Sequence, residues 1–293
     1  MFIDIHVHLR KHQTYLRKGK ATYSTPEHLI KRYDELGIEK AVILRGGASP
    51  ECNLQGQSME EVLDVCSEYP GRFIPFFNVD PRAMTNSSDA PLDELLLYYK
   101  EQGCKGIGEF APNMPFNHPM VQNLFRHAEK VGGMPLTFHI APVIGGTYGL
   151  YDDPGLPQLE MSLYNFPNLY FLGHSTAFWA EIAELETPGD RFFYPSSPVR
   201  KEGVVPKLFR RYKNLLGDLS AGSGFYALYR DPDYGVKFLN EFQDRLFFGT
   251  DICEPDNKTP LVDFLIKLRD EGSISGEVFG KVARENAVRL LNL

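Results

Sequence analysis

The chain has 293 residues, with 31 Lys+Arg against 38 Asp+Glu and a formal net charge of −7. Its hydrophobic fraction of 43% and charged fraction of 24% are ordinary for a globular protein, which excludes a disordered tail, a collagen-like repeat and a disulfide-stapled miniprotein. The sequence has no long basic run, so we expect no binding to nucleic acid.

Short apolar runs recur at fairly even intervals and predict eight strands. Continuous runs such as Ala41–Leu44 are typical of parallel strands that helices cover. The predicted strands are Phe2–His8, Lys40–Arg45, Arg72–Val79, Cys104–Phe110, Pro135–Ile140, Asn168–His174, Asn214–Ser220 and Arg245–Asp251.

Amphipathic helical patterns lie between these runs. The first follows a predicted N-cap at Thr25 and stops at Gly37, as helix start and stop chemistry requires. The predicted helices are Pro26–Leu36, Met59–Glu68, Pro91–Gln102, Met120–Val131, Pro260–Asp270 and Gly276–Leu291.

Eight strands alternating with helices predict a parallel sheet closed into a (β/α)8 TIM barrel of the α/β class. No linker or low-complexity tract marks a second domain, so we expect a single domain over residues 1–293. The sixth unit is long, and its excess around Thr187–Val205 predicts an inserted loop that decorates the barrel.

The cysteines and the apolar stretches bear on the compartment. Cys52, Cys66, Cys104 and Cys253 form no C-x-x-C pair, which favours a reduced, cytoplasmic chain. A strand begins at once near the N-terminus, so we expect no secretory signal. The longest uncharged stretch, Val131–Tyr151, contains glycines and prolines, so we expect no membrane segment.

Reactive side chains stand where several predicted strands end, which in such a barrel is the mouth that holds the active site. His6 and His8 lie two residues apart on the first strand and point to one side. Asp251 ends the eighth strand, which closes beside the first. The other strand-end groups are Glu109, His139 and His174. Converging imidazoles and carboxylates are the ligands that zinc or a similar divalent ion requires.

Motifs in a fixed order run through the whole chain. They are Asp4–His8, Phe138-His139, Gly173-His174, Gly217–Gly224, Phe248–Asp251 and Asn286–Leu291. Together they resemble the amidohydrolase superfamily, specifically the amidohydrolase-related (amidohydrolase 2) branch of metal-dependent barrel hydrolases and decarboxylases.

The resemblance implies that His6, His8, His139 and Asp251 bind a metal ion, expected to be Zn²⁺. For His174 it implies either a second ion or a bond to substrate or to metal-bound water. Glu109 matches the carboxylate that bridges two ions in related barrel deoxyribonucleases, whereas other members use one ion. We expect a mainly mononuclear site with a latent second position.

The resemblance also implies catalysis. Metal-activated water would attack a small ester, lactone or amide, with Asp251 as general base. A decarboxylase of a small or aromatic carboxylic acid on the same barrel is the alternative. A barrel that has lost catalysis and serves in binding or assembly is the third reading, and fold alone does not decide among them.

Arginines near strand ends are candidates for binding a carboxylate-bearing small molecule, because guanidinium groups bind carboxylates in bidentate fashion. They are Arg45, Arg82 and Arg230. The alternative is that Arg82 caps a turn and that Arg230 pairs with Asp231 or Asp233.

Aromatic residues after the fifth and sixth strands, Tyr148 and Trp179, are expected to wall a substrate pocket. Packing beneath those loops is the alternative for both. The sequence leaves the oligomeric state open, with a homo-oligomer among the outcomes.

Overall fold

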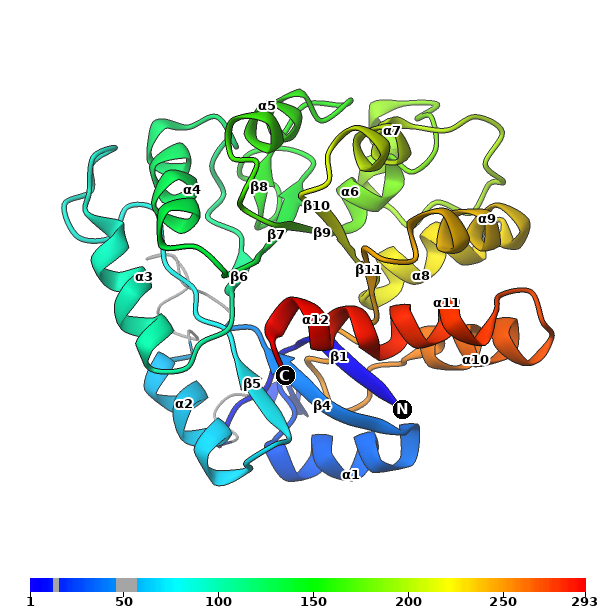
Figure 1. Cartoon of the computed structure of the whole chain (residues 1–293), viewed down its shortest axis with the longest axis horizontal. Coiled ribbons are helices and arrows are strands. Elements are labelled where there is room, and N and C mark those ends of the chain that lie inside the picture. The colour runs from blue at the N-terminus through cyan, green and yellow to red at the C-terminus, as the bar shows by residue number, and fades with distance from the viewer. Residues whose placement is uncertain (13–15, 46–56) are drawn as a thin grey trace.

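The computed structural model describes residues 1–12, 16–45 and 57–293, and Cys52 falls outside this range. Eight parallel strands surround a central axis with helices outside them (Figure 1). Hydrogen bonds join them in the orders β1-β4-β5 and β11-β10-β9-β7-β6. The strands are β1 (Phe2–Val7), β4 (Ile38–Ile43), β5 (Phe73–Pro75), β6 (Ile107–Phe110), β7 (Leu136–Ala141), β9 (Phe171–His174), β10 (Leu215–Asp218) and β11 (Leu246–Phe247).

Backbone hydrogen bonds at two seams close these sheets into a barrel. Between β5 and β6, the Phe77 amide donates to the Gly106 carbonyl at 3.1 Å. Between β11 and β1, the Ile5 amide donates to the Phe248 carbonyl at 3.0 Å. The second seam places the eighth barrel strand beside the first, and the predicted (β/α)8 barrel is confirmed.

The barrel interior is a separate apolar core that the C-terminal helix closes at one end. Asn286 of α12 (Asn286–Leu291) donates from Nδ2 to the carbonyl of Leu246, where β11 begins. In Figure 1 this helix crosses the barrel axis. The opposite end, where the strands finish, is therefore left for the site. The interior core consists of Ile3, Ile5, Val42, Leu44, Ile74, Phe76, Leu172, Leu216, Phe247, Ala287 and Leu291.

The outer helices begin and end largely where their capping residues stand. The Thr25 side chain accepts from the His28 amide, and Gly37 ends that helix with φ at +70°. The helices are α1 (Pro26–Leu36), α2 (Met59–Glu68), α3 (Leu92–Glu101), α4 (Pro119–Val131), α5 (Pro157–Asn165), α6 (Thr176–Ala180), α7 (Val204–Arg211), α8 (Ala221–Tyr229), α9 (Pro232–Phe242), α10 (Pro260–Asp270), α11 (Gly276–Gly280) and α12.

Several elements lie outside the predicted set. The helices α5 to α9 were not predicted individually, and a π-helical turn η3 (Lys281–Glu285) separates α11 from α12. Short strands β2 (Leu16–Arg17) and β3 (Lys20–Ala21) form a hairpin, and β8 (Leu150–Tyr151) pairs with β7. The long sixth unit carries a 3-10 turn, η2 (Pro188–Phe192), between α6 and α7.

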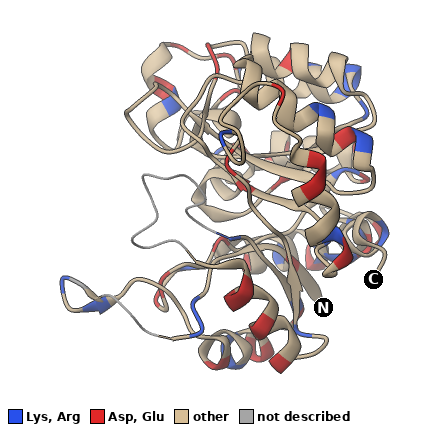
Figure 2. Ribbon diagram, turned by 90° about the vertical axis from the view of Figure 1, so that its left-hand side faces the viewer, with Lys and Arg blue, Asp and Glu red and all other residues tan. Residues whose placement is uncertain are grey.

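Charged side chains are distributed over many elements. Figure 2 shows Lys and Arg together with Asp and Glu along helices and loops of the described chain. No continuous band of one charge sign is visible in this view. Across the described residues, the helices are too short and too polar to traverse a lipid bilayer.

Candidate metal centre

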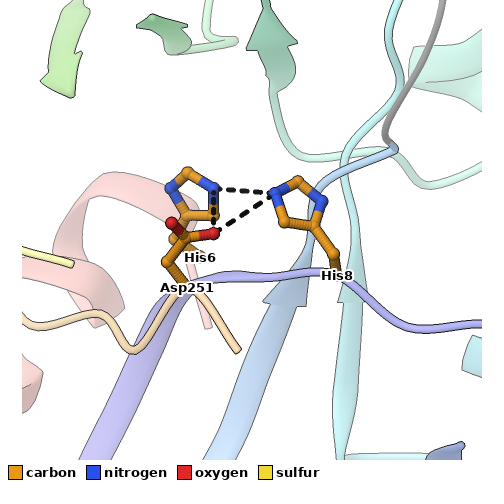
Figure 3. Close-up of side chains that lie close together, drawn as sticks. All are labelled: His6, His8 and Asp251. Carbon is orange, nitrogen blue, oxygen red and sulfur yellow. Dashed lines mark hydrogen bonds and ion pairs between the residues drawn. The ribbon is translucent and has the colours of Figure 1, made fainter. Parts of the chain in front are cut away.

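Three side chains, from the end of β1, the residue after it and the segment after β11, meet at one point. His6 Nε2 lies 3.1 Å from His8 Nε2. Asp251 Oδ1 lies 3.4 Å from the first of these nitrogens and 3.5 Å from the second. Figure 3 shows the three groups turned toward one another. The strand closure that the sequence predicts is what brings Asp251 to the histidine pair.

The far nitrogen of each imidazole has a fixed partner. His8 Nδ1 lies 2.8 Å from the carbonyl oxygen of Leu44, which only accepts, so His8 carries a proton on Nδ1. His6 Nδ1 lies 2.6 Å from Asp218 Oδ2 and donates to it in the same way. Such partners hold the Nε2 atoms of metal-binding histidines toward the ion.

The triangle of donor atoms fits a divalent cation. Ligands at about 2.0–2.1 Å from a tetrahedral zinc ion lie roughly 3.3–3.4 Å apart. The observed edges are 3.1, 3.4 and 3.5 Å. A positive charge between the atoms offsets the repulsion of two nitrogen lone pairs that face a carboxylate oxygen at this distance.

A second group of donors adjoins the triangle. The ligand atoms of Glu109, His139 and His174 lie within 4.8 Å of one another. Glu109 connects the groups, because its Oε2 lies 3.5 Å from His8 Nε2 and its Oε1 lies 4.0 Å from His174 Nε2. His139 belongs to this second group, and β7, which carries it, stands across the barrel mouth from β1. That His139 shares one ion with the triangle stays a prediction.

Asp218 lies beneath both groups and was given no role from the sequence. Its Oδ2 lies 3.4 Å from His174 Nδ1 as well as 2.6 Å from His6 Nδ1. Ser220 Oγ lies 3.2 Å from His6 Nδ1. The same oxygen lies 3.0 Å from His174 Nδ1. The available signal was a carboxylate at the end of the seventh strand, the same place that the other strand-end groups occupy.

The electrostatics of the cluster follow from burial opposed by close opposite charges. Burial disfavours protonated His6, but the Asp218 and Asp251 carboxylates outweigh it and raise its pKa to about 10. Burial likewise opposes ionised Glu109, yet a hydrogen bond from His8 and the charge of His139 bring the Glu109 pKa well below its usual value. Burial lowers the pKa of His139 to about 4, against the effect of Glu109. Glu109 therefore stays ionised beside the imidazoles, and a bound cation would take the place of the proton on His6, because imidazole ligates a metal only in its neutral form.

A buried carboxylate holds the Asp251 segment against β1. Asp4 accepts hydrogen bonds from the Thr250 amide at 2.9 Å and from the Thr250 hydroxyl at 2.5 Å. The Asp251 amide in turn donates to the His6 carbonyl at 2.8 Å. Asp251 has φ of +53°, a left-handed conformation that non-glycine residues rarely adopt. These contacts keep the Asp251 side chain directed at the histidines.

Two of the predicted substrate residues lie at the mouth. The Tyr148 ring centroid is 4.4 Å from that of His139, and the Tyr148 side chain is well exposed. Arg45 follows β4 and is half-buried, and its guanidinium donates to the carbonyls of Gln57 and Asn78. Tyr148 is therefore open to a ligand, whereas Arg45 already has backbone partners.

The other three predicted substrate residues are placed differently. Arg82 forms a bidentate pair with Asp80, whose oxygens lie 2.7 and 2.8 Å from its Nε and Nη2, so the turn-capping alternative describes it. Trp179 is completely buried, and its indole donates to the Asp218 carbonyl at 2.9 Å. The expectation that Trp179 walls a pocket is wrong because its face of α6 packs inward. Arg230 lines a different cavity.

No family model and no curated protein sequence matches the chain. Solved structures match it over its full length. An uncharacterised TIM-barrel protein from Bordetella bronchiseptica has a TM-score of 0.66 at 17% identity, covering 99% of this chain and 98% of that chain.

Two further solved structures carry named activities. A probable 2-pyrone-4,6-dicarboxylic acid hydrolase from Acinetobacter baumannii, with citric acid bound, has a TM-score of 0.60 at 16% identity, covering 100% of this chain and 99% of that one. The 5-carboxyvanillate decarboxylase from Sphingomonas paucimobilis has a TM-score of 0.60 at 14% identity with the same two coverages. The chain shares their barrel fold, as the sequence resemblance implied.

Proposed function

We propose that residues 1–293 form one amidohydrolase-related domain and that the chain is a metal-dependent hydrolase of the amidohydrolase superfamily. Its substrate class is a small ester, lactone or amide. The observation that carries the proposal is the triangle of His6, His8 and Asp251, in which both imidazoles are held at Nδ1 and face the carboxylate. The barrel fold that the chain shares with a hydrolase and with decarboxylases supports the same class of enzyme.

The donor set fits a divalent cation, with Zn²⁺ first because imidazole nitrogens and carboxylate oxygens are its usual ligands. His6, His8 and Asp251 would hold the first ion. A second position is available at Glu109, His139 and His174. The bound ion supplies a Lewis acid that polarises a substrate carbonyl and lowers the pKa of water to about 7.

Asp251 is placed to act as general base. Its side chain is 21% exposed, against 0% for His6 and 9% for His8, so it is the member of the triangle that an entering water meets. Its Oδ2 lies 3.8 Å from His174 Nε2. A proton taken up by Asp251 therefore stays beside His174 until the leaving group accepts it.

His174 acts with Asp251 by keeping a fixed orientation. Its Nδ1 faces Asp218 and Ser220, so its Nε2 is directed at the cleft between Glu109 and Asp251. In that position the imidazole orients a substrate oxygen or the protonated Asp251. Its second role is as a ligand when the second cation position is filled.

A small carboxylate-bearing molecule is the substrate that the neighbouring structures favour. One carries citric acid and another, a 2,6-dihydroxybenzoate decarboxylase, is complexed with 2,6-dihydroxybenzoate. By extension, we expect the substrate of this chain to carry a carboxylate that is not itself the reacting group. The half-open Tyr148 ring beside His139 offers a surface for an apolar or aromatic part of such a molecule.

Decarboxylation of a small or aromatic carboxylic acid is the second candidate. It is favoured by the two decarboxylases whose barrels this chain matches at TM-scores of 0.60 and 0.59. The same donors would serve both reactions, and the difference lies in whether water or a carbon–carbon bond is consumed.

The free thiols favour a reducing compartment such as the cytoplasm. Cys66, Cys104 and Cys253 form no disulfide within the described chain. Burial raises the pKa values of Cys66 and Cys104 to about 12, so both stay protonated and unreactive.

Turnover in ¹⁸O-labelled water separates the two reactions. A panel of lactones, esters and aromatic acids is incubated with the metal-loaded chain, and products are analysed by mass spectrometry. The proposal predicts one labelled oxygen per turnover, in the newly formed carboxylate, and no carbon dioxide. Release of carbon dioxide with an unlabelled organic product would establish the decarboxylase, and the absence of both reactions with a fully loaded protein would favour a non-catalytic barrel.

A further inference from the structure

A cavity of about 380 Å³ lies under the insertion between α6 and α7, apart from the donor clusters. The insertion supplies Glu186, Tyr194 and Arg200 to its wall, and Ala183 supplies part of the wall just after α6. Arg230, the residue that follows α8, completes it. A space of this size accommodates a small organic molecule.

One nitrogen of the partly buried Arg230 guanidinium has no acceptor among the described residues. Its Nε is buried and makes no hydrogen bond. A buried polar group without a partner costs free energy, and for a cation the cost is larger. A ligand that brings an acceptor into the cavity would remove that cost.

Two carboxylates whose charges act on Arg230, Asp231 and Asp190, accept hydrogen bonds from backbone amides. The alternative that Arg230 pairs with Asp231 or Asp233 finds no ion pair among the described residues. Asp231 accepts from the Val199 amide at 2.9 Å and from the Tyr234 amide at 3.1 Å. Asp190 accepts from the Thr187 amide at 3.1 Å, among other donors of the same turn. Backbone capping thus leaves Arg230 directed at the cavity with its hydrogen-bonding capacity unused.

Tyr194 connects this cavity with the metal centre. Its ring stacks on Tyr226 with centroids 5.4 Å apart, and a Cβ at Gly222 would lie 2.8 Å from it. Gly222 follows Ser220 by two residues, and Ser220 touches His6 and His174. Burial and the nearby Asp251 carboxylate raise the Tyr194 pKa. Tyr194 therefore lines the cavity and also packs against Gly222, two residues from the Ser220 that contacts His6 and His174.

We propose that this cavity is a distal subsite that binds a carboxylate of the substrate through Arg230, with Tyr194 on the side of the cavity nearer the metal centre. The subsite rests on the proposed function only in its connection to the reacting group, since carboxylate binding by Arg230 needs no metal. A substrate that fits has a carboxylate at one end and the reacting carbonyl at the other.

The charges around the cavity favour a carboxylate over a phosphate. Lys201 is paired with Glu184, which removes one cation. Arg200 and Arg230 then face Glu186 and Asp190 among the lining residues. With near balance of charge, a singly charged anion is bound with less repulsion than a doubly charged one.

Calorimetric titration of the metal-loaded full chain with benzoate tests the carboxylate site. We expect binding that weakens about 10-fold or more in Arg230→Gln, because a charge-assisted hydrogen bond is lost. Arg230→Lys is expected to retain part of the affinity. The matched control is Arg269→Gln, an exposed arginine on α10 paired with Asp270, which should bind benzoate as the parent does.

Two comparisons decide where benzoate binds. Removal of the metal with a chelator should leave benzoate affinity unchanged, and inorganic phosphate should bind the parent more weakly than benzoate does. Unchanged affinity in Arg230→Gln, or loss of affinity on removal of the metal, would overturn the Arg230 site. Tighter binding of phosphate would overturn the choice of carboxylate.

A series of α,ω-dicarboxylates, from malonate to suberate, tests the connection to the metal centre. One chain length should bind more tightly than benzoate, and this gain should disappear in the metal-free chain and in Arg230→Gln alike. If no length shows a gain while benzoate binding still depends on Arg230, the cavity is a separate site and the subsite is refuted. Failure of the proposed function would be seen in a different measurement: the purified chain would retain no divalent cation.

Discussion

Replacement of Asp218 by asparagine tests how the site holds its histidines. Asp218 Oδ2 lies 2.6 Å from His6 Nδ1 and 3.4 Å from His174 Nδ1, so one carboxylate serves a ligand in each donor group. An asparagine amide in that place can donate to Nδ1, which moves the imidazole proton to Nε2 and blocks the ligand atom.

The size of the effect follows from these contacts. Loss of a partner behind a metal-binding histidine typically lowers affinity 10- to 100-fold, or about 1.4–2.7 kcal/mol. The contact to His6 is short and fully buried, so we expect about 100-fold weaker binding of the first ion. The longer contact to His174 predicts about 10-fold at the second position.

Competition with a chromophoric zinc chelator measures both affinities, and the urea midpoint shows whether the variant is folded. Asp152→Asn is the matched control. Asp152 is also a buried carboxylate, but it accepts from the backbone amides of residues 153, 158 and 159 and contacts none of the metal-centre side chains in these hydrogen bonds. An Asp218→Asn protein that is folded and binds zinc within about 3-fold of the parent would refute the reasoning.

Three further outcomes are expected. Asp251→Asn should keep the fold and most of the metal but lose turnover by about 10²- to 10⁴-fold, measured as kcat, and near-parent turnover would remove Asp251 as the base. Gly173→Ala should lower the free energy of unfolding by about 1–3 kcal/mol in urea titrations, because a Cβ there would overlap the ring of Phe178; an unchanged midpoint would contradict this packing. Burial raises the Asp152 pKa from 3.8 to about 6, so between these values the unfolded chain ionises first and the parent loses stability as pH rises. The free energy of unfolding of the parent minus that of Asp152→Asn should therefore be about 3 kcal/mol lower at pH 7 than at pH 3.5. A difference between the two proteins that does not change with pH would be inconsistent with the buried carboxylate.

The strand pattern and the first donor triangle were within reach of the sequence. Strand closure is a general property of the barrel, so it places the end of the eighth strand beside His6 and His8 once eight units are recognised. The bounds of α1 follow from Thr25 and Gly37, whose local chemistry starts and stops the helix.

The remaining features depend on contacts between distant segments. The grouping of His139 with Glu109 and His174 depends on which strands stand side by side in the barrel, which no local pattern encodes. The orientation of Trp179 depends on which face of the short helix α6 packs against Phe238 and Asp218. Within the described residues the Nε of Arg230 makes no hydrogen bond, and Asp231 accepts instead from the Val199 amide, more than thirty residues away in the chain.

Anomalous diffraction at the zinc absorption edge, from crystals of the chain grown with zinc, tests the central claim most directly. The account predicts a peak within bonding distance of His6 Nε2, His8 Nε2 and Asp251 Oδ1, and a weaker one beside Glu109, His139 and His174. An ordered triangle of the same three side chains with no peak among them, in crystals that contain zinc, would contradict it.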